Sequence, residues 1–169
     1  ASDDLSFMVG LFNSTDWTEF NPTGSYTLGA QVGFKGVYLN LLYGDQDGKL
    51  DEDYLFDTAS AGATFQVDLT AGWDLSDELY LGLNATYNST GAGEIYDGTE
   101  IVDLDGDASG FYGAAVYLQY ALSDAFALGT RVEYFNMYNY GLVDASDPAN
   151  PWGPIGWDEN GDGNVIDIT

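Results

Sequence analysis

The chain contains no cysteine and no histidine among its 169 residues. Without cysteine there are no disulfides, no thiolate metal ligands and no thiol nucleophile. Without histidine the usual proton shuttle and the most common metal-binding side chain are missing, which excludes Ser-His-Asp, Cys-His and histidine–zinc chemistry. Any catalysis would depend on carboxylates alone. We therefore expect no catalytic residues, no enzyme activity and no required cofactor.

Basic residues are nearly absent as well. Lys35, Lys49 and Arg131 are the only bases against 28 acidic residues, and the formal net charge is -25. Such a field repels phosphate, and no basic patch exists to hold a polyanion, so we expect no nucleic-acid partner. No apolar run approaches the ~20 residues that a membrane helix requires. If the protein meets a membrane, it does so with strands.

What is abundant favours an all-β fold. Aromatic residues make up 15% of the chain and glycine contributes 22 residues, unlike the composition of helical proteins. Apolar and polar side chains alternate with a two-residue period, as where Val67 and Leu69 alternate with Asp68 and Thr70, which predicts strands. The segments with this pattern are 5–13, 25–34, 36–44, 63–75, 79–88, 111–122 and 126–135, and a further strand begins within 164–169.

The connections between these segments alternate in length. They are short at 35–36, 75–78 and 122–125, and long near 14–24, 45–60, 89–110 and 136–163. Short turns on one side and long loops on the other are typical of an antiparallel, up-and-down transmembrane β-barrel, with short periplasmic turns and longer extracellular loops. We expect one such domain over 1–169, with about seven to eight strands.

A hairpin is repeated within the chain. The segments WDLSDELYLGLNATY (73–87) and YALSDAFALGTRVEY (120–134) align without a gap and share Leu-Ser-Asp in the turn. A repeat also occurs in propellers, but the unequal loops between these two copies fit duplicated barrel hairpins better.

The two faces of the strands differ in chemistry. One face is bulky and apolar, and aromatic residues gather near the strand ends, where two membrane-interface girdles would lie; the alternative is that these rings cap a soluble β core. The aromatics concerned are Phe34, Tyr43, Trp73, Tyr87, Tyr120 and Tyr134.

The other face carries small and polar residues. Arg131 and Glu133, two residues apart, share this face, and an arginine facing lipid near the midplane would cost about 2–4 kcal/mol. We therefore assign this face to a watery lumen, with Gln31, Gln66, Asp68, Asn84, Gln119, Arg131 and Glu133 as the pore-lining residues.

The segments GFYGAAVYLQYAL and LSDAFALGTRVEYF, together with FQVDLTAGWDLSDELYLGLNATYN before them, resemble the later strands of the OmpL-like outer-membrane β-barrel porins of Bacteroidota and related Gram-negative bacteria. The Gly-x-Arg-x-Glu-Tyr-Phe strand at 129–135 is the most specific part. The resemblance implies a bacterial outer-membrane location, lipid as a partner and a porin-like function. Family members are longer barrels, and outer-membrane barrels commonly end on an aromatic residue, whereas this chain ends on Thr169. We expect a portion of a larger barrel, or closure of the sheet against other membrane-protein subunits.

The segment DENGDGNVID (158–167) resembles most of a calcium loop. Asp158, Asn160 and Asp162 place side-chain oxygens at alternate positions, and Asn164 offers its backbone carbonyl. Gly163 suits the sharp turn, and Asp167 substitutes for the bidentate glutamate that is absent at Thr169. This predicts a weak Ca²⁺ site, whereas the alternative is a solvated turn of favoured turn residues. The predicted ligands are Asp158, Asn160, Asp162, Asn164 and Asp167.

These features favour passive diffusion of small solutes or ions through a polar pore, rimmed by the acidic loops 45–57, 94–107 and 144–167, which would concentrate cations. The acidic loops equally fit mere solubility or adaptation to salt. Two other functions stay open. One is a structural or partner-binding subunit of an outer-membrane assembly. The other is a secreted, soluble calcium- or carbohydrate-binding β domain, in which Trp152 and Trp157 would form a sugar platform.

Overall fold

A computed structural model of the chain describes residues 4–13, 24–45, 59–96, 98–103, 106–139 and 162–169. All regular elements in these ranges are β strands. Within the same ranges, no helix is long and apolar enough to cross a membrane.

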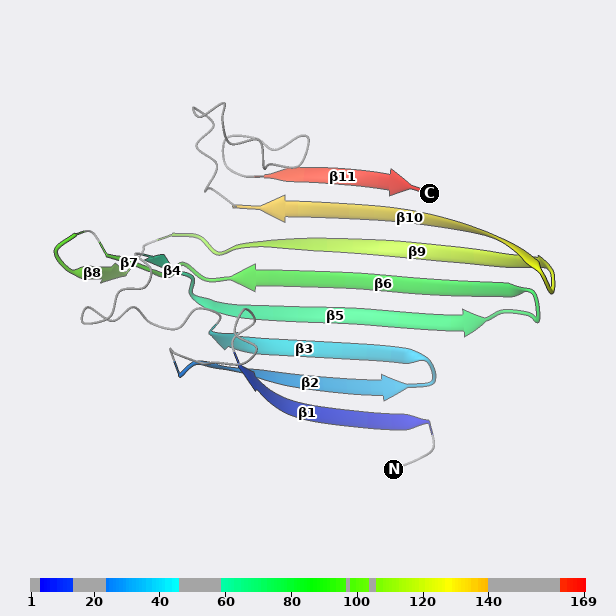
Figure 1. Cartoon of the computed structure of the whole chain (residues 1–169), viewed down its shortest axis with the longest axis horizontal. Coiled ribbons are helices and arrows are strands. Elements are labelled where there is room, and N and C mark those ends of the chain that lie inside the picture. Colours follow the sequence, from blue (N-terminus) through cyan, green and yellow to red (C-terminus); the bar gives the residue numbers. More distant parts are fainter. Residues whose placement is uncertain (1–3, 14–23, 46–58, 97, 104–105, 140–161) are drawn as a thin grey trace.

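The main element is an 8-stranded antiparallel sheet (Figure 1). The strands follow one another in chain order across the sheet, so that each pairs with its neighbours in the up-and-down manner predicted from the sequence. They are β1 (Leu5–Asn13), β2 (Tyr26–Phe34), β3 (Val37–Asp45), β5 (Ala63–Asp74), β6 (Leu79–Thr90), β9 (Ser109–Ser123), β10 (Phe126–Tyr138) and β11 (Gly163–Ile168).

The alternating connections are also confirmed. Residues 35–36, 75–78 and 124–125 turn at one end of the sheet, on the right in Figure 1, which we call the short-turn end. The opposite end, the long-connection end, carries the longer links. Lys35 (φ 49°) and Gly36 (φ 82°) both have left-handed backbones, which is the conformation of a two-residue type I′ hairpin turn.

A second, 3-stranded sheet lies at the long-connection end. Its strands β4 (Ala59–Ser60), β7 (Glu94–Tyr96) and β8 (Ile101–Asp103) come from connections in which the sequence predicts no strand. Strands of two or three residues are too short to show an alternating pattern, because the period is itself two residues. The sheet ties the β3–β5 connection to the β6–β9 connection.

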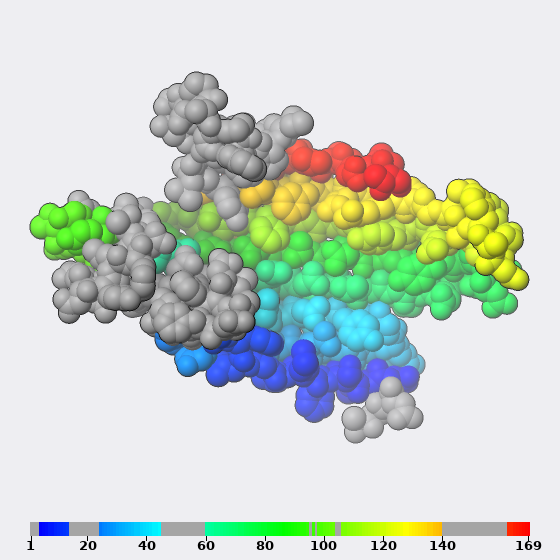
Figure 2. All heavy atoms as spheres, viewed as in Figure 1, coloured from blue at the N-terminus to red at the C-terminus, as the bar shows by residue number. Residues whose placement is uncertain are grey.

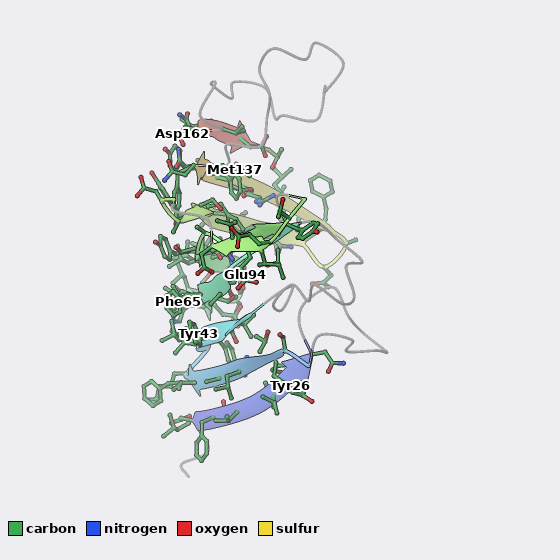
Figure 3. All side chains as sticks on the ribbon, turned by 90° about the vertical axis from the view of Figure 1, so that its left-hand side faces the viewer. Tyr26, Tyr43, Phe65, Glu94, Met137 and Asp162 are labelled. Carbon is green, nitrogen blue, oxygen red and sulfur yellow. The ribbon has the colours of Figure 1, made fainter. Side chains whose placement is uncertain are left out.

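The main sheet is a single layer. Side chains stand on both of its sides (Figure 3), and the space-filling view shows its strands as one continuous surface coloured in sequence order (Figure 2). Among the described residues, the buried hydrophobic side chains are only Ala71 and Ala115. A β sandwich would bury large apolar side chains between two stacked sheets, so the described residues lack the core that the soluble β-domain hypothesis needs.

The sheet does not close on itself over the described residues. β1 pairs only with β2, and β11 only with β10, so these two strands form its edges. The all-β, antiparallel, up-and-down architecture is thus as expected from the sequence.

Candidate functional site: the polar face of the main sheet

Strand register decides which side chains share a face, because residues paired across strands point to the same side of a sheet. One side, the apolar face, carries large hydrophobic side chains in every strand. They are well exposed: Phe7 is 75% exposed and Val9 73%. Alternate residues form the other side, the polar face, which includes Gln31, Asn40, Asp68, Asn84 and Glu133.

The residues that the sequence assigns to a pore wall all lie on this polar face. Gln31 pairs through Asn40 with Asp68 across β2, β3 and β5. The pairings of β5 with β6, of β6 with β9 and of β9 with β10 extend the same side to the remaining predicted residues, which are Gln66, Asn84, Gln119, Arg131 and Glu133.

A hydrogen-bonded chain of side chains crosses four strands of the polar face. The Gln31 amide donates to Asn40 Oδ1 at 2.7 Å, and Asn40 Nδ2 donates to Asp68 Oδ1 at 3.3 Å. Thr70 Oγ1 donates to the same carboxylate oxygen at 3.3 Å and accepts from Asn84 Nδ2 at 3.4 Å. We call these five residues the amide ladder. Its members satisfy part of one another's hydrogen-bonding capacity along the wall.

Further polar contacts lie nearer the long-connection end. Asn88 Nδ2 donates to Gln66 Oε1 at 3.3 Å, and the hydroxyls of Thr64 and Thr90 lie 2.8 Å apart. Asn40, Thr70 and Asn88 are absent from the sequence-based set. The alternating sequence pattern could have identified them, because each occupies a polar position in an alternating strand and therefore shares its face with the predicted residues.

A cluster of charged side chains lies on the polar face of β10 and β11. Arg131 and Glu133 form an ion pair, and their side chains are 39% and 28% exposed. The guanidinium carbon of Arg131 lies 5.4 Å from the ring centroid of Tyr117, its register partner, a cation–π distance. Glu133 pairs directly with Asp167 in the register of β10 and β11. Two carboxylates therefore stand opposite each other, with one arginine beside them.

Aromatic rings also lie against glycines on the polar face. A Cβ atom added to Gly33 would lie 2.8 Å from the Tyr38 ring, and one added to Gly29 would lie 2.6 Å from the Phe12 ring. Side chains that pack over strand glycines cover the exposed backbone, and such glycines permit the sheet to bend. The rings therefore lie along the wall and cover the backbone at these glycines, which have no side chain of their own.

The apolar face carries aromatic residues towards both ends, and all six predicted girdle residues lie on it. At the long-connection end, Tyr87 and Tyr138 stack with ring centroids 6.4 Å apart, and the Tyr138 hydroxyl donates to the backbone carbonyl of Asn88 at 2.9 Å. Phe34, Trp73 and Tyr120 lie towards the short-turn end. Tyrosine and tryptophan with one apolar and one wet end suit the two interfaces of a membrane.

The predicted calcium ligands fall into two groups. Asp158 and Asn160 lie outside the described residues. Asp162 and Asp167 are separated by an extended strand, roughly 16 Å at about 3.3 Å per residue, so the structure does not bring these two together. Asn164 lies on the apolar face opposite Asn136. Asp162 Oδ1 instead accepts a hydrogen bond from the backbone N–H of Asn139 at 2.6 Å.

No group of three or more acidic side chains within the described ranges is arranged to hold a metal ion. Calcium binding by the 158–167 loop stays a prediction, and the distance between Asp162 and Asp167 along β11 counts against Asp167 as one of its ligands.

The comparisons agree with the geometry. The family model described as "Putative beta-barrel porin-2, OmpL-like" matches residues 1–169, from the first residue of the chain to the last. No curated protein and no solved structure matches the chain.

Proposed function

The chain belongs to the OmpL-like β-barrel porin family, and on that premise we propose that it forms the wall of a bacterial outer-membrane channel. Small solutes or ions would diffuse passively past the polar face, and the acidic long connections would rim the pore. Porins are channels rather than enzymes, so no catalytic residue is assigned.

One observation carries this proposal: the main sheet is a single layer with two chemically different faces. The apolar face has exposed large hydrophobic side chains, and the polar face has the amide ladder and the Arg131–Glu133 ion pair. Lipid has no hydrogen bonds to offer to such polar groups. The favourable arrangement therefore puts the apolar face against hydrocarbon and the polar face against water.

The energetic argument concerns orientation. If the sheet were turned round, Arg131 alone would cost about 2–4 kcal/mol near the bilayer midplane, and every amide of the ladder would add to that. Large apolar side chains such as Phe7 and Val9 would meanwhile face water, at roughly 25 cal/mol for each Å² of apolar area. Both terms favour the same orientation, with membrane lipid as the partner of the apolar face.

Conductance in planar lipid bilayers tests this function. The full-length protein should give stepwise current increments. Thr86 and Ala85 are neighbours in β6 on opposite faces, and they supply a matched pair of variants. We expect Thr86→Trp to lower the single-channel conductance, because the ring would narrow the wet path, and Ala85→Trp to leave it unchanged, because that ring would face lipid.

Two outcomes would contradict the proposal. Folded, membrane-inserted protein that carries no current would favour the alternative of a structural or partner-binding subunit, for which the small sheet β4–β7–β8 offers a surface at the long-connection end. A conductance that falls for Ala85→Trp and not for Thr86→Trp would mean that the assignment of the two faces is reversed.

A further inference from the structure

Few charged residues lie on the polar face, and the acidic ones outnumber the basic ones. Within the described strands of the main sheet they are Asp68, Asp74, Arg131, Glu133 and Asp167. Arg131 is the only base among them. The charge that a passing ion meets at this wall is therefore negative, and Arg131 is the one side chain that reduces it.

Arg131 is held in place by its neighbours. Its guanidinium pairs with Glu133 and lies against the Tyr117 ring. Its backbone N–H donates to the Thr169 carbonyl at 2.7 Å, and its carbonyl accepts from the Thr169 N–H at 3.0 Å. These contacts keep the positive charge beside Glu133 on the wall, with part of both side chains open to solvent.

The register puts a second carboxylate next to this ion pair. Glu133 and Asp167 are direct partners across β10 and β11, and like charges in that position repel each other. The Asp167 side chain makes no hydrogen bond or ion pair with the other described residues. Together, two carboxylates and one guanidinium carry a net charge of minus one at the middle of β10.

We propose that Arg131, Glu133 and Asp167 form a charge filter in the pore wall, which favours small cations over anions, and that Arg131 is the residue that limits this preference. The inference rests on the proposed channel function. It places a determinant of selectivity on the strands, whereas the acidic connections at the rim would act only at the mouth.

The filter makes a sharp prediction for charge substitutions. Arg131→Gln makes the group one unit more negative and should raise the cation-to-anion permeability ratio, by roughly two- to fivefold at low salt. Glu133→Gln makes it neutral and should lower the ratio by a similar factor. The double variant restores the original net charge, so its ratio should return close to that of the unmodified protein. Arg131→Lys keeps the charge and should also stay close to it.

Reversal potentials measured across a KCl gradient in planar bilayers report this ratio for each channel. Lys35→Gln is the matched control, because it also removes one positive charge, but at the short turn, where Lys35 lies near Asp4 and the Phe34 ring. It should leave the reversal potential unchanged. Differences among the variants should shrink at about 1 M salt, where the Debye length falls from about 10 Å to about 3 Å.

The outcomes separate this inference from the proposed function. Channels that conduct, but whose reversal potential is the same in Arg131→Gln, Glu133→Gln and the double variant, would overturn the filter and leave the channel standing. An equal shift in Lys35→Gln would also overturn it, since overall charge would then explain the effect. If Arg131→Gln fails to insert, Glu133→Gln and the double variant still decide. Absence of current from every protein would instead refute the channel itself.

Discussion

At the scale of single residues, the turn between β2 and β3 shows how strongly local geometry restricts the sequence. Gly36 has a left-handed backbone (φ 82°), and a Cβ atom added to it would lie 2.8 Å from the carbonyl oxygen of Gly72 in the neighbouring strand. Gly36 is therefore required for two independent reasons. Lys35 (φ 49°) occupies the other left-handed position without being glycine.

Gly36→Ala should destabilise the protein by about 1–2 kcal/mol, because alanine is strained in the left-handed region and its methyl group would press on the β5 backbone. Lys35→Asn should be neutral or slightly stabilising, since Asn-Gly is the favoured pair for this turn and the exposed Lys35–Asp4 contact at 3.9 Å contributes little. Urea unfolding of the refolded protein in lipid vesicles measures both. Equal stabilities for Gly36→Ala and the unmodified protein would contradict the turn assignment.

At the scale of elements, the two copies of the repeated hairpin have a serine at the equivalent position of the turn, but the two serines make different hydrogen bonds. Ser76 Oγ accepts from the backbone N–H groups of Glu78 at 3.2 Å and Leu79 at 3.1 Å. Among the described residues, the corresponding Ser123 Oγ accepts from a single backbone group, the Ala125 N–H at 3.4 Å. The same Leu-Ser-Asp sequence therefore closes the β5–β6 turn more firmly than the β9–β10 turn.

We expect Ser76→Ala to cost about 0.5–1.5 kcal/mol, the usual contribution of lost hydrogen bonds, and Ser123→Ala to cost less. Because the two serines occupy equivalent places in the repeat, each variant is the control for the other in the same unfolding measurement. A larger loss for Ser123→Ala would show that the turns differ from the geometry described above.

The calcium prediction also belongs to an element, the connection that leads into β11. If 158–164 binds Ca²⁺, calorimetric titration should show weak binding, with a dissociation constant in the range of about 10⁻⁴–10⁻³ M, and Asp158→Asn should abolish it. Asp167→Asn should leave the binding unchanged, because Asp167 lies far along β11. Loss of calcium binding in Asp167→Asn would restore the ligand set read from the sequence, and absence of binding in the unmodified protein would leave the solvated turn.

At the scale of the whole molecule, the orientation of the sheet can be tested with one pair of neighbours. Leu69 lies on the apolar face, opposite Leu39 and Ala85, and Thr70 lies on the polar face. We expect Leu69→Arg to destabilise the membrane-inserted protein by about 2–4 kcal/mol and Thr70→Arg to cost much less. Unfolding in vesicles provides the comparison. Equal costs at the two positions would argue against a lipid-facing side.

The strands of the main sheet and their up-and-down order were predicted well from the sequence. A two-residue period identifies a strand whatever its partner, and alternating connection lengths indicate antiparallel neighbours. The shared face of Arg131 and Glu133 follows from their spacing alone. Contacts between distant strands were beyond that reasoning: the bond from the Tyr138 hydroxyl to Asn88, 50 residues away, depends on a register that no local pattern fixes. The separation of Asp162 from Asp167 follows from the strand expected within 164–169, because an extended strand holds its two ends apart; the calcium-loop prediction did not take that strand into account.

The amide ladder has a consequence for the passage of solutes through the pore. Its side chains use part of their hydrogen-bonding capacity on one another, so a passing solute finds fewer vacant donors and acceptors there than on a wall of unpaired polar side chains and would be held only briefly. Conduction requires binding weak enough to permit exit. Flux should therefore rise in proportion to solute concentration, without the plateau that marks a carrier or a channel with a tight resting place.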